Sequence, residues 1–412
     1  RDTIPPPIQP TSGNEEPEFV GHVRTEEDME DQYIFYRPSQ GKKVLVVDRN
    51  RHECFFLKWK TLKKDQRKRR ELDPRYFDQV ERQKFSDSDA KEWQSFLDIG
   101  AVTVVPPEQA RKVPTDRIFK RPARIVRTDK NQMEGELHAK SRMVLPGDVD
   151  PDGEKPLEDG GIRTDAPTSS QIAFHVFCSN AVRRQWRIKS FDVSTAFLHG
   201  DEQKREIYCR PPKDGLPGVH PDSLLRVNTG VYGLREAPRL WYLKANRILR
   251  EAGWEELKTA RSCYVLRDKK DNNKLVGMLL LYVDDACFGG SGQLYDTVIK
   301  RTLEQFTVGK TQEDEFDFLG RHVTQRKDFS IEVDMDKYLR GVERVMIPMS
   351  RRKQSNSPLT PKELHDYRSI VGQLAWPARQ VMPQLAYHVS DLQQKTAQAT
   401  VHDLVHANHV LE

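Results

Sequence analysis

The feature that most constrains this sequence is an apolar stretch that ends on two adjacent acids. Residues 275–290 read Leu-Val-Gly-Met-Leu-Leu-Leu-Tyr-Val-Asp-Asp-Ala-Cys-Phe-Gly-Gly and follow the turn-forming residues 271–273. An apolar run of this length between turn residues predicts a strand that is buried on both faces. Two carboxylates ~4 Å apart, here Asp284 and Asp285, repel each other by about 4 kcal/mol at an effective dielectric constant of about 20. A divalent cation would reverse that repulsion; the alternative is an ordinary acidic turn between two strands.

The composition limits the class of protein and its compartment. With 412 residues, 36% hydrophobic and 31% charged, the chain is long enough for two to four structural units, and much of its surface is solvated or faces a ligand. The five cysteines are widely spaced without a Cys-x-x-Cys pair, which argues against a zinc site or disulfides and predicts a reducing, intracellular compartment. This does not distinguish a cytoplasmic particle from the nucleus. No apolar stretch approaches the ~20 residues that span a bilayer, and no signal peptide is present, so we expect no membrane partner.

The first 85 residues show little apolar periodicity. The proline run at 5–7 and the acidic region 15–31 predict a linker. The apolar-rich segments 43–47 and 54–59 predict two paired strands of a small module. The basic run from Lys58 to Arg70 suits a polyanionic partner, and the alternative is a solvated or disordered run. Because the chain begins at Arg1 without a Met, we expect it to be a segment of a longer protein.

From residue 86 onward the pattern alternates between helices and short strands. Ser86 or Asp87 can cap a helix that carries Trp93, Phe96 and Leu97 and that ends at Gly100. Strands are predicted at 102–105, 118–120, 123–126, 140–144, 187–192, 264–266, 274–283, 316–323 and 330–333. Further helices are predicted after Ser170, from Pro238 to Gly253, at 294–306, from Asp336, and over most of 361–412. In the helix after Ser170 the apolar residues that recur near a 3.6-residue period are Ile172, Val176, Phe177 and Val182. In the last region the apolar residues on one side are Tyr367, Ile370, Val371 and Leu374.

Three carboxylates are predicted to stand at strand ends. In the strand 187–192, side chains alternate, so Asp192 shares a face with Ile188 and Ser190 and lies at the end. Together with Asp284 and Asp285 it supplies the minimum for two divalent ions about 3.5 to 4 Å apart, an arrangement that joins or cuts phosphodiesters. All-oxygen ligands favour Mg²⁺. The alternative is three unrelated surface acids. The acidic loop 148–164 lacks the closing Glu of a calcium loop, which argues against a calcium site there.

Four blocks in fixed order carry a family resemblance. They are Phe191-Asp-Val-Ser-Thr-Ala-Phe-Leu-His-Gly200, Glu206-Ile-Tyr-Cys-Arg-Pro211, Val231-Tyr-Gly-Leu-Arg-Glu-Ala-Pro-Arg-Leu-Trp-Tyr242 and Tyr282-Val-Asp-Asp285. In order and spacing the chain resembles the reverse transcriptase of Ty1/copia-type retrotransposons, part of a Pol polyprotein, from about Glu92 to Glu412. The likeness includes Lys140-Ser-Arg142 and the segment 367–374, which in the family precedes ribonuclease H.

The resemblance implies an α+β fold shaped as a right-hand polymerase. Fingers and palm, an antiparallel sheet plus helices, would occupy 86–290, and a thumb 291–346. A mostly helical segment, 347–412, would lead toward a ribonuclease H domain that is absent, because the chain ends before its acidic residues. Residues 1–85 would form the linker and small module.

The resemblance also assigns roles to residues. Asp192, Asp284 and Asp285 match the palm carboxylates that hold two Mg²⁺ ions and catalyse the reaction. Phe197, five positions after Asp192, matches the aromatic ring that excludes a ribose 2′-hydroxyl; the alternative is a buried Phe after a strand. Tyr232 and Gly233 match the block against the nascent base pair, where Gly lets the backbone approach the nucleotide.

Four basic residues match positions that contact phosphate or template. Lys140 and Arg142 match the cations that hold the incoming triphosphate, and the alternative is a solvated strand edge. Arg235 and Arg239 would contact template or phosphate, and the alternative is exposed arginines at a helix start. Two departures put activity, not fold, in question: Glu236 stands where Gln is commoner, and 145–147 replace the usual basic-glycine ending of the fingers block.

The implied activity is RNA-directed DNA polymerisation, in which the primer 3′-hydroxyl attacks the α-phosphate of a deoxynucleoside triphosphate. The implied partners are an RNA and DNA template-primer and deoxynucleoside triphosphates, and the sequence indicates no oligomeric state. One alternative is a decayed or domesticated copy that keeps the fold and binds nucleic acid. Another is a two-metal nuclease, which fits the carboxylates but gives Phe197 and Tyr232-Gly233 no purpose.

Overall fold

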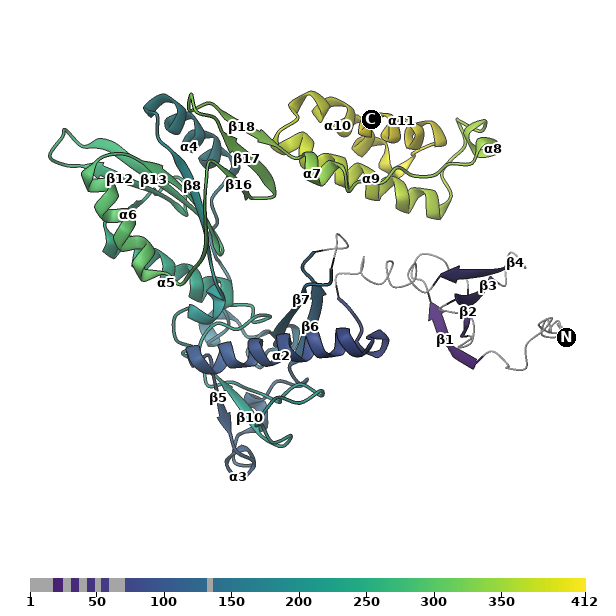
Figure 1. The fold of residues 1–412 in the computed structure, drawn as a ribbon, viewed down its shortest axis with the longest axis horizontal. Helices are drawn as coiled ribbons and strands as arrows, with labels where there is room; N and C mark the ends of the chain where they lie inside the picture. Colours follow the sequence, from purple (N-terminus) through teal and green to yellow (C-terminus); the bar gives the residue numbers. More distant parts are fainter. Residues whose placement is uncertain (1–17, 25–30, 37–42, 49–52, 59–70, 132–135) are drawn as a thin grey trace. The chain divides into compact units, whose positions relative to one another are not determined.

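The computed structural model describes residues 18–24, 31–36, 43–48, 53–58, 71–131 and 136–412 (Figure 1). The chain divides into two compact units. The first comprises 1–98, 121–145 and 210–223, and the second comprises 99–120, 146–209 and 224–412. Within the described ranges, no helix combines the length and the apolar character needed to cross a membrane.

The N-terminal region contains a four-stranded antiparallel sheet in the order β1-β2-β3-β4. Its strands are β1 (Glu18–Arg24), β2 (Asp31–Tyr36), β3 (Lys43–Asp48) and β4 (Glu53–Lys58). The predicted pairing of the strands near 43–47 and 54–59 is confirmed. The prediction of a linker over 15–31 is wrong where β1 lies, because its sequence EFVGHVR contains the strand-favouring Phe and Val. Residues 5–7 and the basic run beyond Lys58 lie outside the described residues.

Helix α2 (Gln79–Ile99) begins about two turns before the predicted cap. A reciprocal capping box explains the difference: the Glu81 N–H donates to Asp78 Oδ1 at 2.9 Å, and the Asp78 N–H donates to Glu81 Oε2 at 3.0 Å. The helix ends as predicted, with Gly100 at φ +70°. Of the apolar residues that the predicted helix carries, Trp93 and Phe96 are buried, whereas Leu97 is exposed.

Helix α2 also covers one edge of a hairpin formed by β6 (Arg124–Asp129) and β7 (Ala139–Val144). The N–H groups of Ser141 and Met143 on β7 donate to Ser88 Oγ at 2.9 Å and Glu92 Oε1 at 3.1 Å. Ser88 and Glu92 lie one turn apart on α2, so they match alternate N–H groups of the strand. The free edge of β7 is thereby protected from pairing with another strand.

The second unit is built on a six-stranded antiparallel sheet in the order β11-β12-β13-β14-β8-β15. Its strands are β8 (Ile188–Val193), β11 (Glu255–Glu256), β12 (Cys263–Asp268), β13 (Lys274–Tyr282), β14 (Asp285–Gly290) and β15 (Val308–Glu313). The apolar stretch 275–290 is therefore two strands rather than one. Asp284 lies in the turn between them, Asp285 begins β14, and the central residues of both strands are buried.

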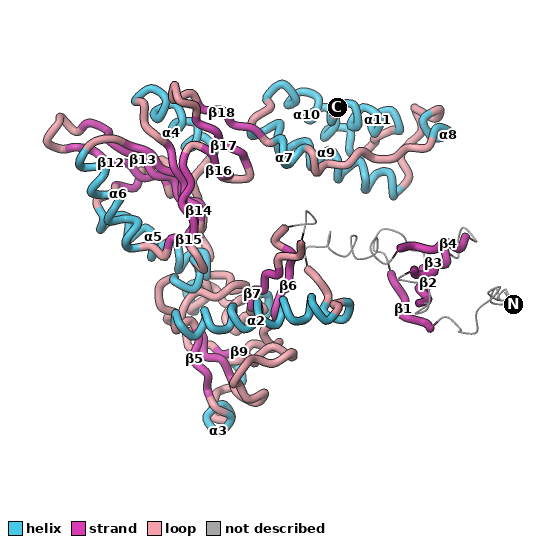
Figure 2. Tube along the Cα trace, viewed as in Figure 1, coloured by secondary structure: helices cyan, strands magenta, loops and turns pink. Residues whose placement is uncertain are grey.

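Helices cover both faces of this sheet (Figure 2). Helices α5 (Ala237–Ala252) and α6 (Gln293–Gln305) pack on the face that carries Phe191, Leu279 and Phe288. Helix α5 follows the prediction, with its apolar side buried and Gly253 ending it at φ +118°. Helix α4 (Gln171–Arg184) packs on the opposite face.

The buried side of α4 differs from the prediction. Its N-cap is Ser170 as predicted, and Ser170 Oγ accepts a hydrogen bond from the Ala173 N–H at 3.2 Å. Of the predicted core residues only Phe177 is buried, whereas Ile172 is 75% exposed; Val176 and Val182 are also exposed. The helix is apolar on two sides, and the side with aromatic rings and small alanines packs onto the sheet.

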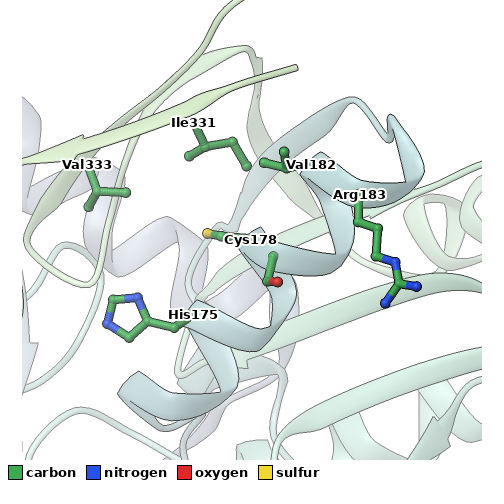
Figure 3. A pocket seen from close by; sticks show the side chains of 7 residues that line it. His175, Cys178, Val182, Arg183, Ile331 and Val333 are labelled. Carbon is green, nitrogen blue, oxygen red and sulfur yellow. The ribbon is translucent and has the colours of Figure 1, made fainter. Parts of the chain in front are cut away.

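The outer side of α4 lines a pocket together with β18. Figure 3 shows side chains of α4, among them Cys178 and Val182, facing Ile331 and Val333 of β18. Strand β18 (Ile331–Asp334) belongs to a small sheet with β16 (Glu315–Phe318) and β17 (Arg321–Gln325), in the order β16-β17-β18. None of the predicted site residues lines this pocket.

Two strand predictions are wrong. The predicted strand 316–323 is the β16–β17 hairpin, because Leu319 (φ +56°) and Gly320 (φ +70°) form a tight turn inside it. The segment 118–120 makes only an isolated bridge from Ile118 to Tyr208. Strand β15 has no counterpart among the predicted strands.

The remaining elements include a three-stranded sheet and a C-terminal group of helices. The sheet has the order β5-β10-β9, with β5 (Val102–Val105), β9 (Tyr208–Cys209) and β10 (Leu224–Val227). The helix predicted from Asp336 is the single turn α7 (Asp336–Leu339). The C-terminal helices are α9 (Pro361–Gln380), α10 (Ala386–Gln394) and α11 (Val401–Leu411), and the predicted buried side of α9 is confirmed.

Candidate active site

The sheet places Asp192 directly opposite Asp285. The two residues are register partners in the antiparallel ladder between β8 and β14. Residues that face each other in such a ladder have Cα atoms about 4.5 to 5.5 Å apart. Asp284 occupies the turn immediately before β14, and its carbonyl oxygen accepts a hydrogen bond from the Val193 N–H at 2.8 Å. The three aspartates predicted from the sequence thus gather at one end of the central sheet.

The turn that carries Asp284 is held in a strained conformation. Val283 has φ +56°, which is costly for a β-branched residue, by roughly 1 to 3 kcal/mol. The Trp241 indole Nε1–H of α5 donates to the Val283 carbonyl oxygen at 2.5 Å. This hydrogen bond fixes the tip of the hairpin and, with it, the direction in which Asp284 leaves the sheet.

The electrostatics of the site favour a bound cation. Burial and the charges of Asp284 and Asp192 raise the pKa of Asp285 to about 6. Each of these causes disfavours the ionised form of the Asp285 carboxyl. A divalent ion would supply the missing positive charge, and hard carboxylate oxygens suit Mg²⁺.

A glycine leaves room for the Asp192 carboxylate. The ladder between β15 and β8 is irregular between Val308 and Lys310, which puts Gly309 beside Asp192. A Cβ atom built on Gly309 would lie 2.6 Å from Asp192 Oδ2 and would also collide with Ser194 Oγ. Any larger residue at 309 would therefore displace the carboxylate.

The three aspartates are neighbours, but their side chains do not point toward one common metal position. Over 71–131 and 136–412, no three or more His, Cys, Asp or Glu side chains are arranged so that they could hold a metal ion. The donor chemistry and the clustered negative charge nevertheless fit a divalent ion, because reorienting side chains at fixed backbone positions is a small change.

Two other predicted site residues touch each other. Phe197 lies in the 3₁₀ helix 196–199, and its ring centroid is 5.6 Å from that of Tyr232, with 66° between the ring planes. Gly233 follows at φ +91°. A Cβ atom on Gly147 would collide with the carbonyl oxygen of Gly233, so the two glycines allow a direct backbone contact.

Lys140 and Arg142 lie on β7 in the first unit. Lys140 is half-buried and Arg142 is exposed, whereas Ser141 between them is buried, as strand alternation requires. Burial raises the pKa of Glu92, and the charges of Arg142 and Lys140 act in the opposite direction. The two cations therefore lie near a carboxylate of α2, and their role toward a triphosphate stays a prediction.

The structure shows partners within the protein for Arg235, Glu236 and Arg239. Arg235 Nη1 donates to the Gly153 carbonyl oxygen at 2.9 Å, and Arg239 pairs with the Asp165 carboxylate. Glu236 accepts hydrogen bonds from Arg205. Sequence reasoning missed Arg205 altogether. The available signal is the acidic loop 148–164, whose acids supply two of the three carboxylates that Arg205 binds.

Comparison with known proteins identifies the family. A model described as reverse transcriptase (RNA-dependent DNA polymerase) matches residues 105–350, more than half of the chain, including all three aspartates. The chain belongs to this reverse transcriptase family. The Ty1/copia resemblance deduced from the four blocks is thereby confirmed, as is the predicted enzyme class at the level of the family. The antiparallel sheets and packed helices agree with a reverse transcriptase domain.

Relatives of this reverse transcriptase are Pol polyproteins of plant and yeast transposons. The Retrovirus-related Pol polyprotein from transposon RE2 of Arabidopsis thaliana is 29% identical over 284 residues, 65% of this chain and 18% of its own length. The Retrovirus-related Pol polyprotein from transposon TNT 1-94 of Nicotiana tabacum is 26% identical over 247 residues, 54% of this chain and 18% of its own length. The Transposon Ty1-DR1 Gag-Pol polyprotein of Saccharomyces cerevisiae is 22% identical over 279 residues, 62% of this chain and 15% of its own length. The chain thus spans less than a fifth of each of these relatives.

Proposed function

We propose that this chain is an active RNA-directed DNA polymerase that extends a primer with deoxynucleotides along an RNA template. The observation that carries the proposal is the pairing of Asp192 with Asp285 on adjacent strands, in a chain that belongs to a reverse transcriptase family. In this proposal 86–290 are fingers and palm, 291–346 the thumb, and 347–412 a helical segment that follows it.

Asp192, Asp284 and Asp285 would hold two Mg²⁺ ions. When bound, these ions stabilise the attacking and leaving oxygens of the phosphoryl transfer. The protein's own contribution is to fix three carboxylates at the end of a sheet that is packed on both faces. Asp285 has a pKa raised to about 6, so it is mostly ionised at neutral pH and offers its oxygens as ligands.

The aromatic pair and the cations of β7 would bind the nucleotide. The Phe197 ring, held against Tyr232 at 5.6 Å between centroids, would occupy the space that a ribose 2′-hydroxyl needs. The positive φ and missing side chain of Gly233 would let the backbone approach the nascent base pair. Lys140 and Arg142 would contact the triphosphate through charge-assisted hydrogen bonds.

Primer extension on an RNA template with Mg²⁺ and deoxynucleotides tests the proposal. The wild-type chain should extend the primer, and Asp284→Asn should lower the rate by about 100-fold or more, the scale of lost electrostatic stabilisation. Asp271→Asn is the matched control, because Asp271 lies in the turn before β13 and forms an exposed ion pair with Lys274. A folded wild-type protein that binds RNA but extends no primer would support the decayed copy instead.

A further inference from the structure

A buried cluster of charges links four separate segments of the second unit. Arg205, whose side chain is 14% exposed, is its centre. Arg205 Nη1 donates to Asp150 Oδ1 and to Asp152 Oδ2, each at 2.8 Å, and Nη2 donates to Asp150 Oδ2 at 3.1 Å. Arg205 Nε donates to Glu236 Oε1 at 3.0 Å. One guanidinium thus binds three carboxylates.

Two further cations balance the charge of the cluster. The Arg117 guanidinium donates to the two oxygens of Asp152 at 3.0 and 2.9 Å, and Lys155 Nζ lies 2.7 Å from Asp152 Oδ1. Although burial acts to raise it, hydrogen bonds from Arg117, Lys155 and Arg205 hold the pKa of Asp152 well below its ordinary range. Asp150 is 0% and Asp152 3% exposed, so water cannot replace a lost partner of either.

The cluster joins the loop 146–165 to the loop that carries Tyr232 and Gly233. Contacts on both sides of the Arg205–Glu236 pair complete this junction: Gly147 meets the Gly233 backbone, Arg235 donates to the Gly153 carbonyl oxygen at 2.9 Å, and Arg239 pairs with Asp165. Because Glu236 is three residues after Gly233, a displacement of Glu236 moves the Tyr232-Gly233 turn with it.

We propose that Arg205 is a positioning residue for the incoming deoxynucleotide, which it serves by holding Glu236 and thereby the Tyr232-Gly233 turn in place. The role at the nucleotide rests on the proposed function. It also accounts for an acid at 236, where the family more often has Gln. The Glu236 carboxylate is turned to Arg205, so its charge is neutralised within the protein and does not repel the triphosphate.

The first test measures whether Arg205 orders the turn. Hydrogen exchange of the full chain should show amides of 147–153 and 231–236 exchanging about 10-fold faster in Arg205→Gln, because local opening becomes easier. Amides of α9 should be unchanged. Arg326→Gln is the control, since Arg326 pairs with Glu332 on the surface. Unchanged exchange in Arg205→Gln overturns the proposal.

The second test separates positioning from simple stability. In primer extension, Arg205→Gln should raise the KM for deoxynucleotide by about 10-fold or more and change kcat by less than about threefold, as a misplaced binding surface does. The double variant Arg205→Gln/Glu236→Gln should lie nearer to wild type than Arg205→Gln alone, because it removes one of the three carboxylate charges that Arg205 neutralises and leaves a side chain that can still accept from Gln203 Nε2, which donates to Glu236 Oε1 at 2.6 Å. Independent effects of the two substitutions, or a loss of kcat with an unchanged KM, overturn the role at the nucleotide.

The two tests tell failure of this inference from failure of the proposed function. A wild-type chain that extends no primer refutes the polymerase and the nucleotide role together, whereas faster exchange in Arg205→Gln then still supports the ordering of the turn by Arg205. Faster exchange with an unchanged KM in an active enzyme overturns the inference and leaves the proposed function intact.

Discussion

Replacing Asp285 by Asn should stabilise the metal-free protein above pH 6 while it removes a ligand of the proposed ions. The pKa of Asp285 is raised from an ordinary 3.8 to about 6, which corresponds to about 3 kcal/mol at about 1.4 kcal/mol for each tenfold change in proton affinity. The side chain is half-buried, and solvent screening reduces this value. We therefore expect the free energy of unfolding to rise by about 1.5 kcal/mol in Asp285→Asn at neutral pH.

The pH dependence gives this prediction its sign. Well below pH 4 the carboxyl is protonated in both the folded and the unfolded chain, so the variant and the wild type should approach equal stability there. Between pH 4 and 6 the folded wild type binds more protons than the unfolded chain, so its stability falls as the pH rises. The advantage of Asp285→Asn should grow over this range and stay constant above pH 6.

Urea unfolding at pH 4, 5 and 7.5, followed by tryptophan fluorescence, measures this difference. Trp241 is a suitable reporter because its indole binds the turn between β13 and β14. Adding Mg²⁺ should stabilise the wild type more than Asp285→Asn and narrow the gap, since only an intact site gains from binding. Glu304→Gln, at an exposed position of α6, is the control and should change little. A variant that is less stable than the wild type at pH 7.5, or a gap that is the same at every pH, would refute the reasoning.

Three further predictions concern single positions. Gly309→Ala should reduce primer extension by about 100-fold with a small loss of stability, because the new methyl displaces the Asp192 carboxylate, and unchanged kcat would contradict this. Arg321→Met should raise the free energy of unfolding by about 1 kcal/mol or more, measured by urea unfolding. Arg321 is 1% exposed, its Cζ lies 4.1 Å from the centroid of the Phe174 ring, and in the part of the chain that the structure describes none of its guanidinium nitrogens has a hydrogen-bond partner. Phe197→Val should admit ribonucleotides, and unchanged discrimination between the two sugars in primer extension would remove Phe197 from that role.

The elements that the sequence predicted well are those with local signals at both ends. Helix α5 has Pro238 in its first turn, one apolar side and Gly253 after its end, so each of these signals agrees with the others. The hairpin of β12 and β13 has the turn residues 271–273 between two apolar runs.

The errors arose where the deciding contact is tertiary or where two patterns overlap. Helix α4 carries apolar residues on two sides, and periodicity alone does not show that Phe174 rather than Ile172 faces the sheet. In 316–323 the alternation of apolar residues continues through the Leu319-Gly320 turn, which hid a hairpin. The start of α2 depended on a polar capping box at Asp78 in a region that looked unstructured.

The candidate site divides in the same way. The three aspartates were predicted because each ends or follows an apolar run and because their blocks match a family. The role of Arg205 was not predicted, because the three carboxylates that it binds come from two other segments and only the folded chain brings them together. In the sequence, Glu236 is a departure from the family pattern that puts activity in question, whereas in the structure it forms an ion pair with Arg205.

The placement of Asp192 and Asp285 on one rung of a ladder has a consequence for how such a chain can change. Backbone hydrogen bonds between β8 and β14 set the spacing of the two acids. The length of the segment that separates them along the chain does not affect this spacing. Loops within that segment can therefore change in length without altering the distance between the two aspartates. Sequence differences among related reverse transcriptases can thus accumulate in the connecting loops, while the neighbouring strands β8 and β14 keep the two aspartates opposite each other.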